Sequence, residues 1–150
     1  MKPGAETIHV AVGIVADAAG AVLIARRPDH AHQGGLWEFP GGKVETDEAV
    51  EAALQRELHE ELGITVQVAE PWLRVRHAYP DKTVLLDVWR VTAWDGEPRG
   101  REGQPLRWAA PARLADFAFP AADEPIVARL RRDCGQIAQH ASSKGTSAML

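Results

Sequence analysis

Three glutamates at close spacing are the residues of this sequence best suited to do chemistry. Glu57, Glu60 and Glu61 fall in a segment whose apolar residues recur at helical spacing. At about 100° per residue, Glu60 and Glu61 lie roughly 60° and 40° from Glu57, so all three project from one stripe of a helix. Carboxylates this close repel one another, and hard oxygen ligands select Mg²⁺ or Mn²⁺. The stripe is therefore a candidate metal site.

A solvated acidic face is the alternative interpretation of this stripe, because charge runs are commonly exposed. Two features favour metal binding instead. Val50 and Leu54 lie within about 60° of Glu57 on the same helix, so the stripe borders a buried face. Upstream, residues 40–42 (Pro-Gly-Gly) predict a tight turn whose backbone can approach a ligand closely and whose carbonyls suit the same metal.

The surrounding pattern predicts the elements that position these residues. The helix is expected to begin at Thr46 or Asp47, either of which can cap it, and to end at Gly63 as its C′ residue. The first two predicted strands are expected to pair as a hairpin across a turn at residues 17–20. Strands are predicted over Ile8–Val15, Ala21–Ala25, Ile64–Ala69, Trp72–Tyr79, Thr83–Ala93 and Leu106–Ala109, with one or two helical turns over Pro111–Asp116.

A last helix is predicted with Asp123 as its N-cap and Gly135 as its stop. Strands interrupted by two main helices predict an α+β fold, in which a mixed sheet is covered by helices. The length of 150 residues suits one domain, which we assign to residues 1–133. Residues 134–150 are expected to form a disordered C-terminal tail.

Composition and charge exclude several functional classes. The formal net charge of -4 argues against a duplex nucleic-acid partner, and no apolar run reaches the roughly 20 residues of a membrane span. Lys2 is the only positive charge near the N-terminus, which does not predict a secretory signal. Cys134 is the only cysteine, so no internal disulfide can form and a cytoplasmic location is expected. We expect a monomer that acts on a small phosphorylated molecule.

The full spacing of the glutamate segment resembles the Nudix box. Every fixed position of that signature is filled, by Gly42, Glu48, Arg56, Glu57, Leu58, Glu60, Glu61, Gly63 and Ile64. The resemblance implies the Nudix fold, a mixed β-sheet sandwiched between helices, with the box as a loop-helix-loop. It also implies hydrolysis of a nucleoside diphosphate that is linked to another group.

The resemblance assigns roles to the residues of the box. The three glutamates are implied to bind Mg²⁺, or alternatively Mn²⁺, with help from the carbonyl of Gly41. Glu57 is further implied to be the catalytic base that deprotonates water. The structural positions of the box, Gly42, Glu48, Arg56 and Gly63, are expected to hold the loop and helix in place.

The resemblance extends beyond the box to the MutT-type Nudix hydrolases, over about residues 8–130. Segments in the same order and at similar spacing are Val10–Ile14, Arg26–Arg27, Glu38–Lys43, Gly96–Pro98, Glu102–Pro105 and Glu124–Pro125. The implied reaction is hydrolysis of 8-oxo-dGTP to 8-oxo-dGMP and pyrophosphate. Such a reaction sanitises the nucleotide pool for DNA replication and avoids mutation.

Residues outside the box receive roles by the same resemblance. Glu102 would be a further metal ligand, or alternatively a surface acid. Arg27 would contact the nucleotide, or face solvent at a strand end, and Phe39 would line the base pocket, or pack in the core. Lys43 would meet phosphate, or be an ordinary loop lysine. Glu38 and Asp123 complete the expected substrate-binding set.

Asp123 departs from the pattern of the MutT-type proteins. They carry an asparagine at this position, and its amide reads the oxidised base. An aspartate here can still serve as a helix N-cap. The aspartate does not affect the expected hydrolytic reaction, but it leaves open which base the protein prefers.

Two rival functions follow from these patterns. The first is a Nudix hydrolase of another nucleotide, such as an ordinary dNTP, a dinucleoside polyphosphate or ADP-ribose. The second is a sensor of the same fold that binds nucleotide without turnover. Glu57, Glu60 and Glu61 are all present, which argues against a sensor, because binding alone does not require a base.

Overall fold

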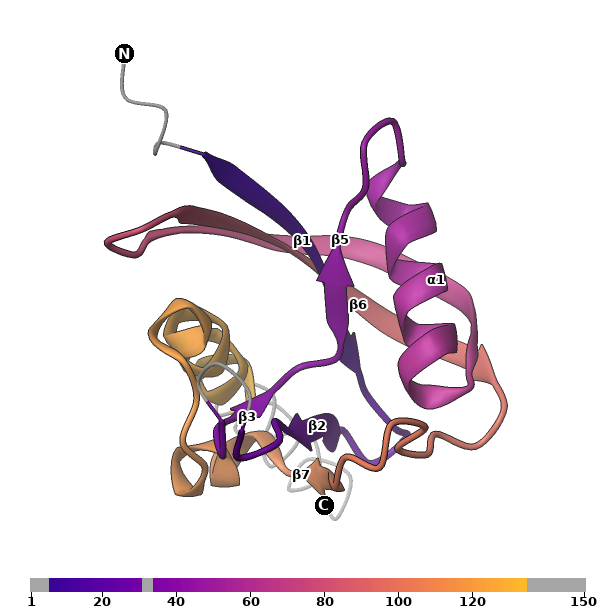
Figure 1. The fold of residues 1–150 in the computed structure, drawn as a ribbon. Coiled ribbons are helices and arrows are strands. Elements are labelled where there is room, and N and C mark those ends of the chain that lie inside the picture. Colours follow the sequence, from indigo (N-terminus) through magenta and orange to yellow (C-terminus); the bar gives the residue numbers. More distant parts are fainter. Residues whose placement is uncertain (1–5, 31–33, 135–150) are drawn as a thin grey trace, which may run out of the picture.

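Two β-sheets and one long α-helix form the framework of the molecule (Figure 1). The computed structural model describes residues 6–30 and 34–134. The strands and helices are β1 (Thr7–Val15), β2 (Val22–Arg26), β3 (Trp37–Glu38), β4 (Gly41–Lys43), α1 (Val50–Leu62), β5 (Thr65–Ala78), β6 (Thr83–Asp95), β7 (Leu106–Ala109) and the 3-10 helices η1 (Pro111–Asp116) and η2 (Ala121–Asp123). A further α-helix covers residues 124–134.

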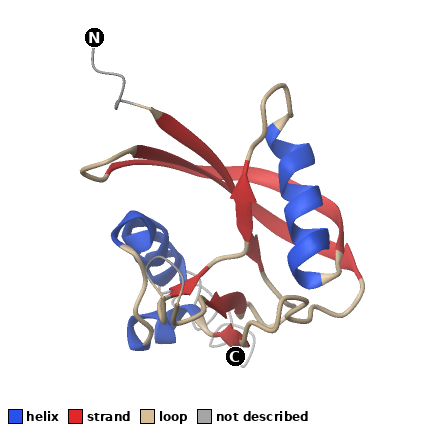
Figure 2. Cartoon of the chain, in the orientation of Figure 1, coloured by secondary structure: helices blue, strands red, loops and turns tan. Residues whose placement is uncertain are grey.

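The larger sheet is mixed, with the strand order β4-β1-β6-β5. Strand β1 is antiparallel to β4 and parallel to β6, whereas β5 and β6 form an antiparallel pair. The smaller sheet has the order β3-β2-β7 and is antiparallel. Helix α1 covers one side of the larger sheet, and the helix at 124–134 lies on the other side (Figure 2). The predicted α+β architecture, a mixed sheet between helices, is confirmed.

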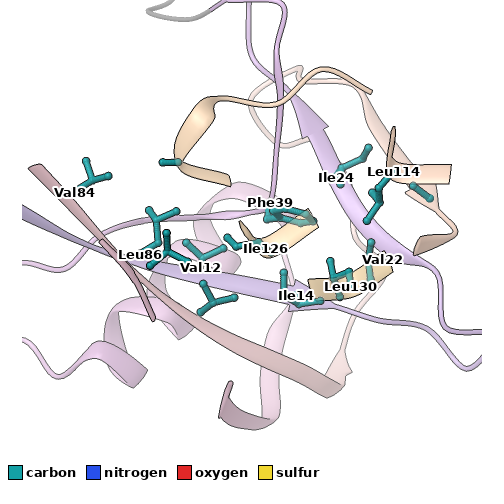
Figure 3. Close-up of a cluster of buried hydrophobic side chains, with 14 residues drawn as sticks. Val12, Ile14, Val22, Ile24, Phe39, Val84, Leu86, Leu114, Ile126 and Leu130 are labelled. Carbon is teal, nitrogen blue, oxygen red and sulfur yellow. The ribbon is translucent and has the colours of Figure 1, made fainter. Parts of the chain in front are cut away.

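Side chains of β1 alternate between two hydrophobic cores, as the two-residue period of a strand requires. Ala11 and Val15 pack with the buried face of α1. Val12 and Ile14 point the opposite way and pack in a second core, which also contains Ile126 from the C-terminal helix (Figure 3). Strand β1 is thus buried on both faces, which fixes its register beneath α1.

The predicted hairpin between the first two strands is wrong. Only an isolated bridge between Ala16 and Val22 joins them, and β1 and β2 belong to different sheets. The reason is that both edges of β1 are occupied, one by β4 and the other by β6. The chain reverses at Asp17, whose side chain accepts hydrogen bonds from the backbone N–H groups of Ala19 and Ala21.

The predicted start of the box helix is also wrong. Helix α1 begins at Val50, its N-cap is Ala49, and neither Thr46 nor Asp47 caps it. Asp47 has a φ of 63°, which is incompatible with a helix. The backbone N–H of Glu45 donates to the side chain of Glu48 at 3.0 Å, so the preceding residues form a turn instead. The predicted end is confirmed, since Gly63 is left-handed (φ 74°) and its N–H bonds to the carbonyl of His59.

The strands after α1 differ in number from the prediction. One continuous strand, β5, covers the two predicted segments and absorbs the interruption by shifts of register, one of them between Pro71 and Leu73. Strands β6 and β7 and the helical turns of η1 lie where they were predicted. The short strands β3 and β4 were not predicted.

The predicted end of the last helix and the predicted tail fall at or beyond the limit of the described residues. Cys134 is still helical, whereas Gly135 and the rest of the predicted tail lie outside the residues that the structure describes. Within the described part of the chain, no helix combines the length and apolar character needed to cross a membrane.

Candidate active site

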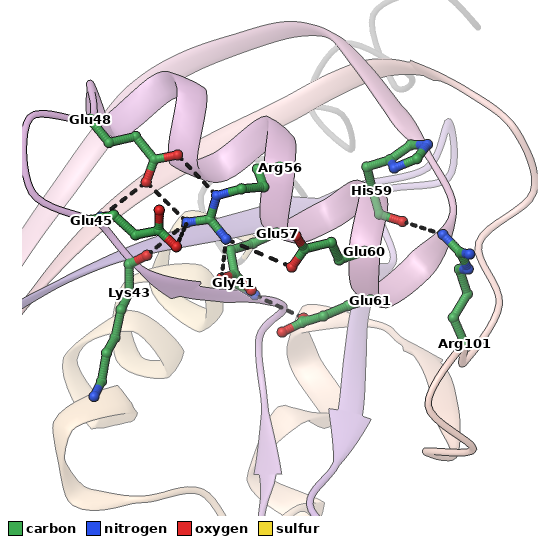
Figure 4. Close-up of polar contacts among 10 residues, drawn as sticks. All are labelled: Gly41, Lys43, Glu45, Glu48, Arg56, Glu57, His59, Glu60, Glu61 and Arg101. Carbon is green, nitrogen blue, oxygen red and sulfur yellow. Dashed lines mark hydrogen bonds and ion pairs between the residues drawn. The ribbon is translucent and has the colours of Figure 1, made fainter.

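Arg56 holds the loop before α1 against the helix (Figure 4). Its guanidinium makes two hydrogen bonds of 2.9 Å to the two carboxylate oxygens of Glu48, and its Nη2 donates to the carbonyl of Lys43 at 3.0 Å. Hydrogen bonds from Arg56, and a weaker one from the N–H of Glu45, lower the pKa of Glu48 to about 2. The planar fork of arginine matches a carboxylate in this way, which a lysine would not.

Glu57 lies between this arginine and strand β4. Arg56 Nη1 donates to Glu57 Oε1 at 2.8 Å and lies 3.7 Å from Glu60 Oε2. Burial raises the pKa of Glu57 and outweighs the opposing effect of Arg56. The carboxylate rests over Gly42, where a Cβ atom would overlap it. A side chain at this point of β4 would therefore displace the carboxylate of Glu57.

Glu61 is the most strongly perturbed acid of the stripe. Its Oε2 accepts a hydrogen bond from the N–H of Gly41 at 3.3 Å. Burial raises its pKa to about 8, with a further rise from the charge of Glu57 and smaller ones from Glu38 and Glu102. The carboxylates of α1 therefore share one region of negative potential with two acids from outside the helix.

The loop that carries Glu102 is tethered to the last turn of α1 by contacts that were not predicted from the sequence. The side chain of Gln104 donates to the carbonyl of Glu61 at 3.1 Å and accepts from the N–H of Glu102 at 2.9 Å. Arg101 donates to the carbonyl of His59 at 3.0 Å. The last carbonyls of a helix lack hydrogen-bond partners within the helix. A basic or amide side chain downstream can supply one, and this was the only sequence signal for the tether.

The donor set fits a hard divalent cation in its chemistry. It consists of carboxylate oxygens, and burial together with the charges of neighbouring acids raises the pKa of Glu61. In the described part of the chain, no three acidic, histidine or cysteine side chains are gathered closely enough to hold an ion as they stand. Glu57 and Glu60 instead face the guanidinium of Arg56.

A cavity of about 290 Å³ opens beside the acids, on the side of the sheet opposite α1. Its floor is apolar and comes from β1 and β6. All five residues predicted to bind substrate line it, together with both glycines of β4: Arg27, Glu38, Phe39, Gly41, Gly42, Lys43 and Asp123. Phe39 is only 5% exposed and stacks on Phe119 at 5.1 Å, so it belongs both to the core and to the cavity wall.

The charged groups of the cavity shift one another's pKa values. Arg27 Nη1 lies 3.4 Å from Glu38 Oε2, and the Nε of Arg27 is buried without a hydrogen-bond partner among the described residues. Burial raises the pKa of Glu38 despite the nearby arginine. The pKa of Asp123 is raised to about 7, mainly by burial and further by Glu38, with Arg27 acting in the opposite direction.

Asp123 directly precedes the helix of residues 124–134, as the sequence predicted, but it is already the last residue of the 3-10 helix η2. Among the described residues, its side chain accepts no capping hydrogen bond from that helix. Its carboxyl instead lines the cavity. Two other lining residues, Tyr79 and Lys82, were not predicted, because they come from the turn between β5 and β6, far from the box in sequence.

Comparison with known proteins agrees with this geometry. The model of the family described as NUDIX domain matches residues 11–129. The chain is 42% identical to an 8-oxo-dGTP diphosphatase of Escherichia coli K12, over 85% of this chain and 98% of that protein. It is 37% identical to a CTP pyrophosphohydrolase of the same organism, over 81% of this chain and 90% of that one.

A solved structure from a study of MutT from Aliivibrio salmonicida and Vibrio cholerae is also similar. It superposes with a TM-score of 0.75 at 41% identity, covering 85% of this chain and 99% of the other.

Proposed function

The chain belongs to the NUDIX domain family of hydrolases, and we propose that it hydrolyses 8-oxo-dGTP to 8-oxo-dGMP and pyrophosphate with the aid of Mg²⁺. The observation that carries the proposal is the cavity, because every residue expected to bind the substrate lines it, next to the carboxylates of α1. The reaction would remove a damaged precursor from the cytoplasm before a polymerase incorporates it.

The residues divide the work of this reaction. Glu57, Glu60, Glu61, Glu102 and the carbonyl of Gly41 would hold the metal. When bound, the metal neutralises the charge of the polyphosphate and acidifies a water molecule. Glu57 accepts the proton of the attacking water as the general base.

The remaining residues position the substrate and the box. Arg27 and Lys43 balance negative charge at the cavity, while Phe39 contributes apolar surface to the cavity wall. Arg56 and Glu48 fix the loop and helix through their paired hydrogen bonds. Gly42 leaves room for the carboxylate of Glu57, and Gly63 ends the helix.

Hydrolysis of another nucleotide is the second candidate, and the position of Asp123 favours examining it. A carboxyl group lines the cavity where the MutT resemblance leads one to expect an amide, and a CTP pyrophosphohydrolase is among the relatives. Values of kcat/KM with Mg²⁺ for 8-oxo-dGTP, dGTP, CTP and ADP-ribose separate the candidates. The proposal requires 8-oxo-dGTP to have the highest kcat/KM. A higher kcat/KM for CTP would make CTP hydrolysis the function instead.

Removal of divalent metal is expected to abolish turnover. Without a cation, the acids of α1 repel both the polyphosphate and one another. The measurement is 8-oxo-dGTP hydrolysis after treatment with EDTA, followed by addition of Mg²⁺ or Mn²⁺ in excess. Full activity in EDTA would exclude the metal from the mechanism, whereas recovery on addition of either ion supports it.

Selectivity for the oxidised base is expected to fall as pH rises through about 7. Oxidation makes N7 of guanine a donor while O6 remains an acceptor, so a protonated carboxyl of Asp123 pairs with both atoms and an ionised one does not. With a pKa of about 7, the protonated fraction drops by about tenfold between about pH 6 and pH 8. The ratio of kcat/KM for 8-oxo-dGTP over dGTP should drop in parallel.

Asp123→Asn provides the matched comparison, because the amide accepts and donates at every pH. This variant should keep the preference for 8-oxo-dGTP and lose its pH dependence. An identical ratio in both proteins at every pH would mean that Asp123 does not read the base.

A further inference from the structure

The cavity has two walls that come from distant parts of the chain. One is the turn between β5 and β6, which contributes Tyr79 and Lys82. The other is the segment around η2, which contributes Pro120, Ala122 and Asp123. A hydrogen bond joins the two walls directly, since the backbone N–H of Ala122 donates to the hydroxyl oxygen of Tyr79 at 3.2 Å.

The hydroxyl of Tyr79 is held on a well-defined support. The backbone of Tyr79 closes the turn with two hydrogen bonds to Lys82, of 2.7 Å and 3.3 Å. Its ring packs edge-on against His77, with 4.5 Å between ring centroids, and also against the second core. The Tyr79 hydroxyl can therefore hold its hydrogen-bond partner, the backbone of Ala122, in a fixed position.

The partner of this hydroxyl is buried and adjoins the acid of the cavity. Ala122 is 4% exposed, so its N–H has little access to water. The next residue, Asp123, ends η2, and its N–H bonds to the carbonyl of Pro120 at 3.0 Å. Because η2 is a single short turn, a shift of Ala122 moves Asp123 with it.

We propose that Tyr79 is a positioning residue for base selection, because its hydroxyl holds η2 so that the Asp123 carboxyl faces the base. The inference rests on the proposed function. Polar recognition depends on the placement of donors and acceptors to within fractions of an ångström. Ordinary dGTP has no N–H at N7 for this carboxyl to meet. Loss of the bond to Ala122 should therefore affect 8-oxo-dGTP far more than dGTP.

Tyr79→Phe tests the inference, because it removes only the hydroxyl and keeps the ring. The ratio of kcat/KM for 8-oxo-dGTP over dGTP is expected to fall by about tenfold, the scale of one lost or misaligned hydrogen bond. The change should appear in KM for 8-oxo-dGTP, with kcat changed by less than about twofold. Amide exchange followed by NMR should be faster at Ala122 in the variant than in the wild type.

Two further variants separate positioning from a general structural effect. Thr83→Val removes a hydroxyl at the start of β6, outside the cavity, and should leave the ratio unchanged. In an Asp123→Ala background, Tyr79→Phe should cause no additional loss of selectivity, because it acts through that residue.

Three outcomes for Tyr79→Phe would overturn this inference and leave the proposed function standing. They are an unchanged ratio of kcat/KM for 8-oxo-dGTP over dGTP, an equal loss of kcat/KM for both substrates, and an unchanged rate of amide exchange at Ala122. A wild-type enzyme that hydrolyses both nucleotides with equal efficiency would instead refute the proposed function, and the selectivity role of Tyr79 with it.

Discussion

Replacing Glu57 with glutamine is expected to lower the turnover of 8-oxo-dGTP by about 10²–10⁴-fold, the usual contribution of a general base, with weakened metal binding adding to the loss. Glutamine has the same size but cannot take a proton from water. Its amide oxygen can still accept the hydrogen bond that Arg56 now donates at 2.8 Å. The substitution also removes a repulsive charge near Glu60, so the fold should persist.

The measurements for this variant are kcat with saturating Mg²⁺ and the melting temperature. Glu51→Gln is the matched control, since Glu51 is exposed in the first turn of the same helix and does not line the cavity. It should retain wild-type turnover. If Glu57→Gln also turned over at a near-normal rate, Glu57 would not be the base.

The two glycines of β4 are expected to fail in different ways when replaced by alanine. At Gly42 the new methyl group would overlap the carboxylate of Glu57, the mobile end of a side chain. That carboxylate must move away, so turnover should fall by about 10²-fold or more, in line with the cost of a misplaced catalytic group, while the melting temperature changes little. At Gly41 the methyl group would instead overlap the carbonyl oxygen of Ala11 in the neighbouring strand.

The backbone of β1 cannot move aside as a side chain can, because both faces of that strand are buried. Gly41→Ala should therefore destabilise the fold by about 1–3 kcal/mol, as overpacking commonly does. Thermal melts and kcat for both variants provide the comparison. A Gly42→Ala enzyme with full activity, or a Gly41→Ala protein as stable as wild type, would contradict the described packing at that glycine.

Much of the site could be predicted because it is local in sequence. Glu57, Glu60 and Glu61 lie on one helix, so helical geometry alone placed them together, and the end of that helix at Gly63 followed from the conformational freedom of glycine. The apolar, β-branched run of residues 8–15 likewise indicated a strand. These features depend on neighbours within a few residues, which a sequence displays directly.

The features that were missed depend on contacts between distant residues. The hairpin prediction failed because β4 and β6, rather than β2, occupy the edges of β1. The bond from Gln104 to Glu61 and that from Ala122 to Tyr79 each span 43 positions of the chain. No local pattern pairs such distant residues. The tether of the Glu102 loop, and the cavity wall formed by Tyr79 and Lys82, therefore emerged only from the folded structure.

Product analysis with the wild-type protein is the decisive test of the proposed hydrolysis. 8-oxo-dGTP is incubated with the protein and Mg²⁺, and the nucleotide and phosphate products are separated and quantified. We expect 8-oxo-dGMP and pyrophosphate in equal amounts, with neither formed in EDTA. Release of orthophosphate with 8-oxo-dGDP, or no conversion of 8-oxo-dGTP at all, would contradict it.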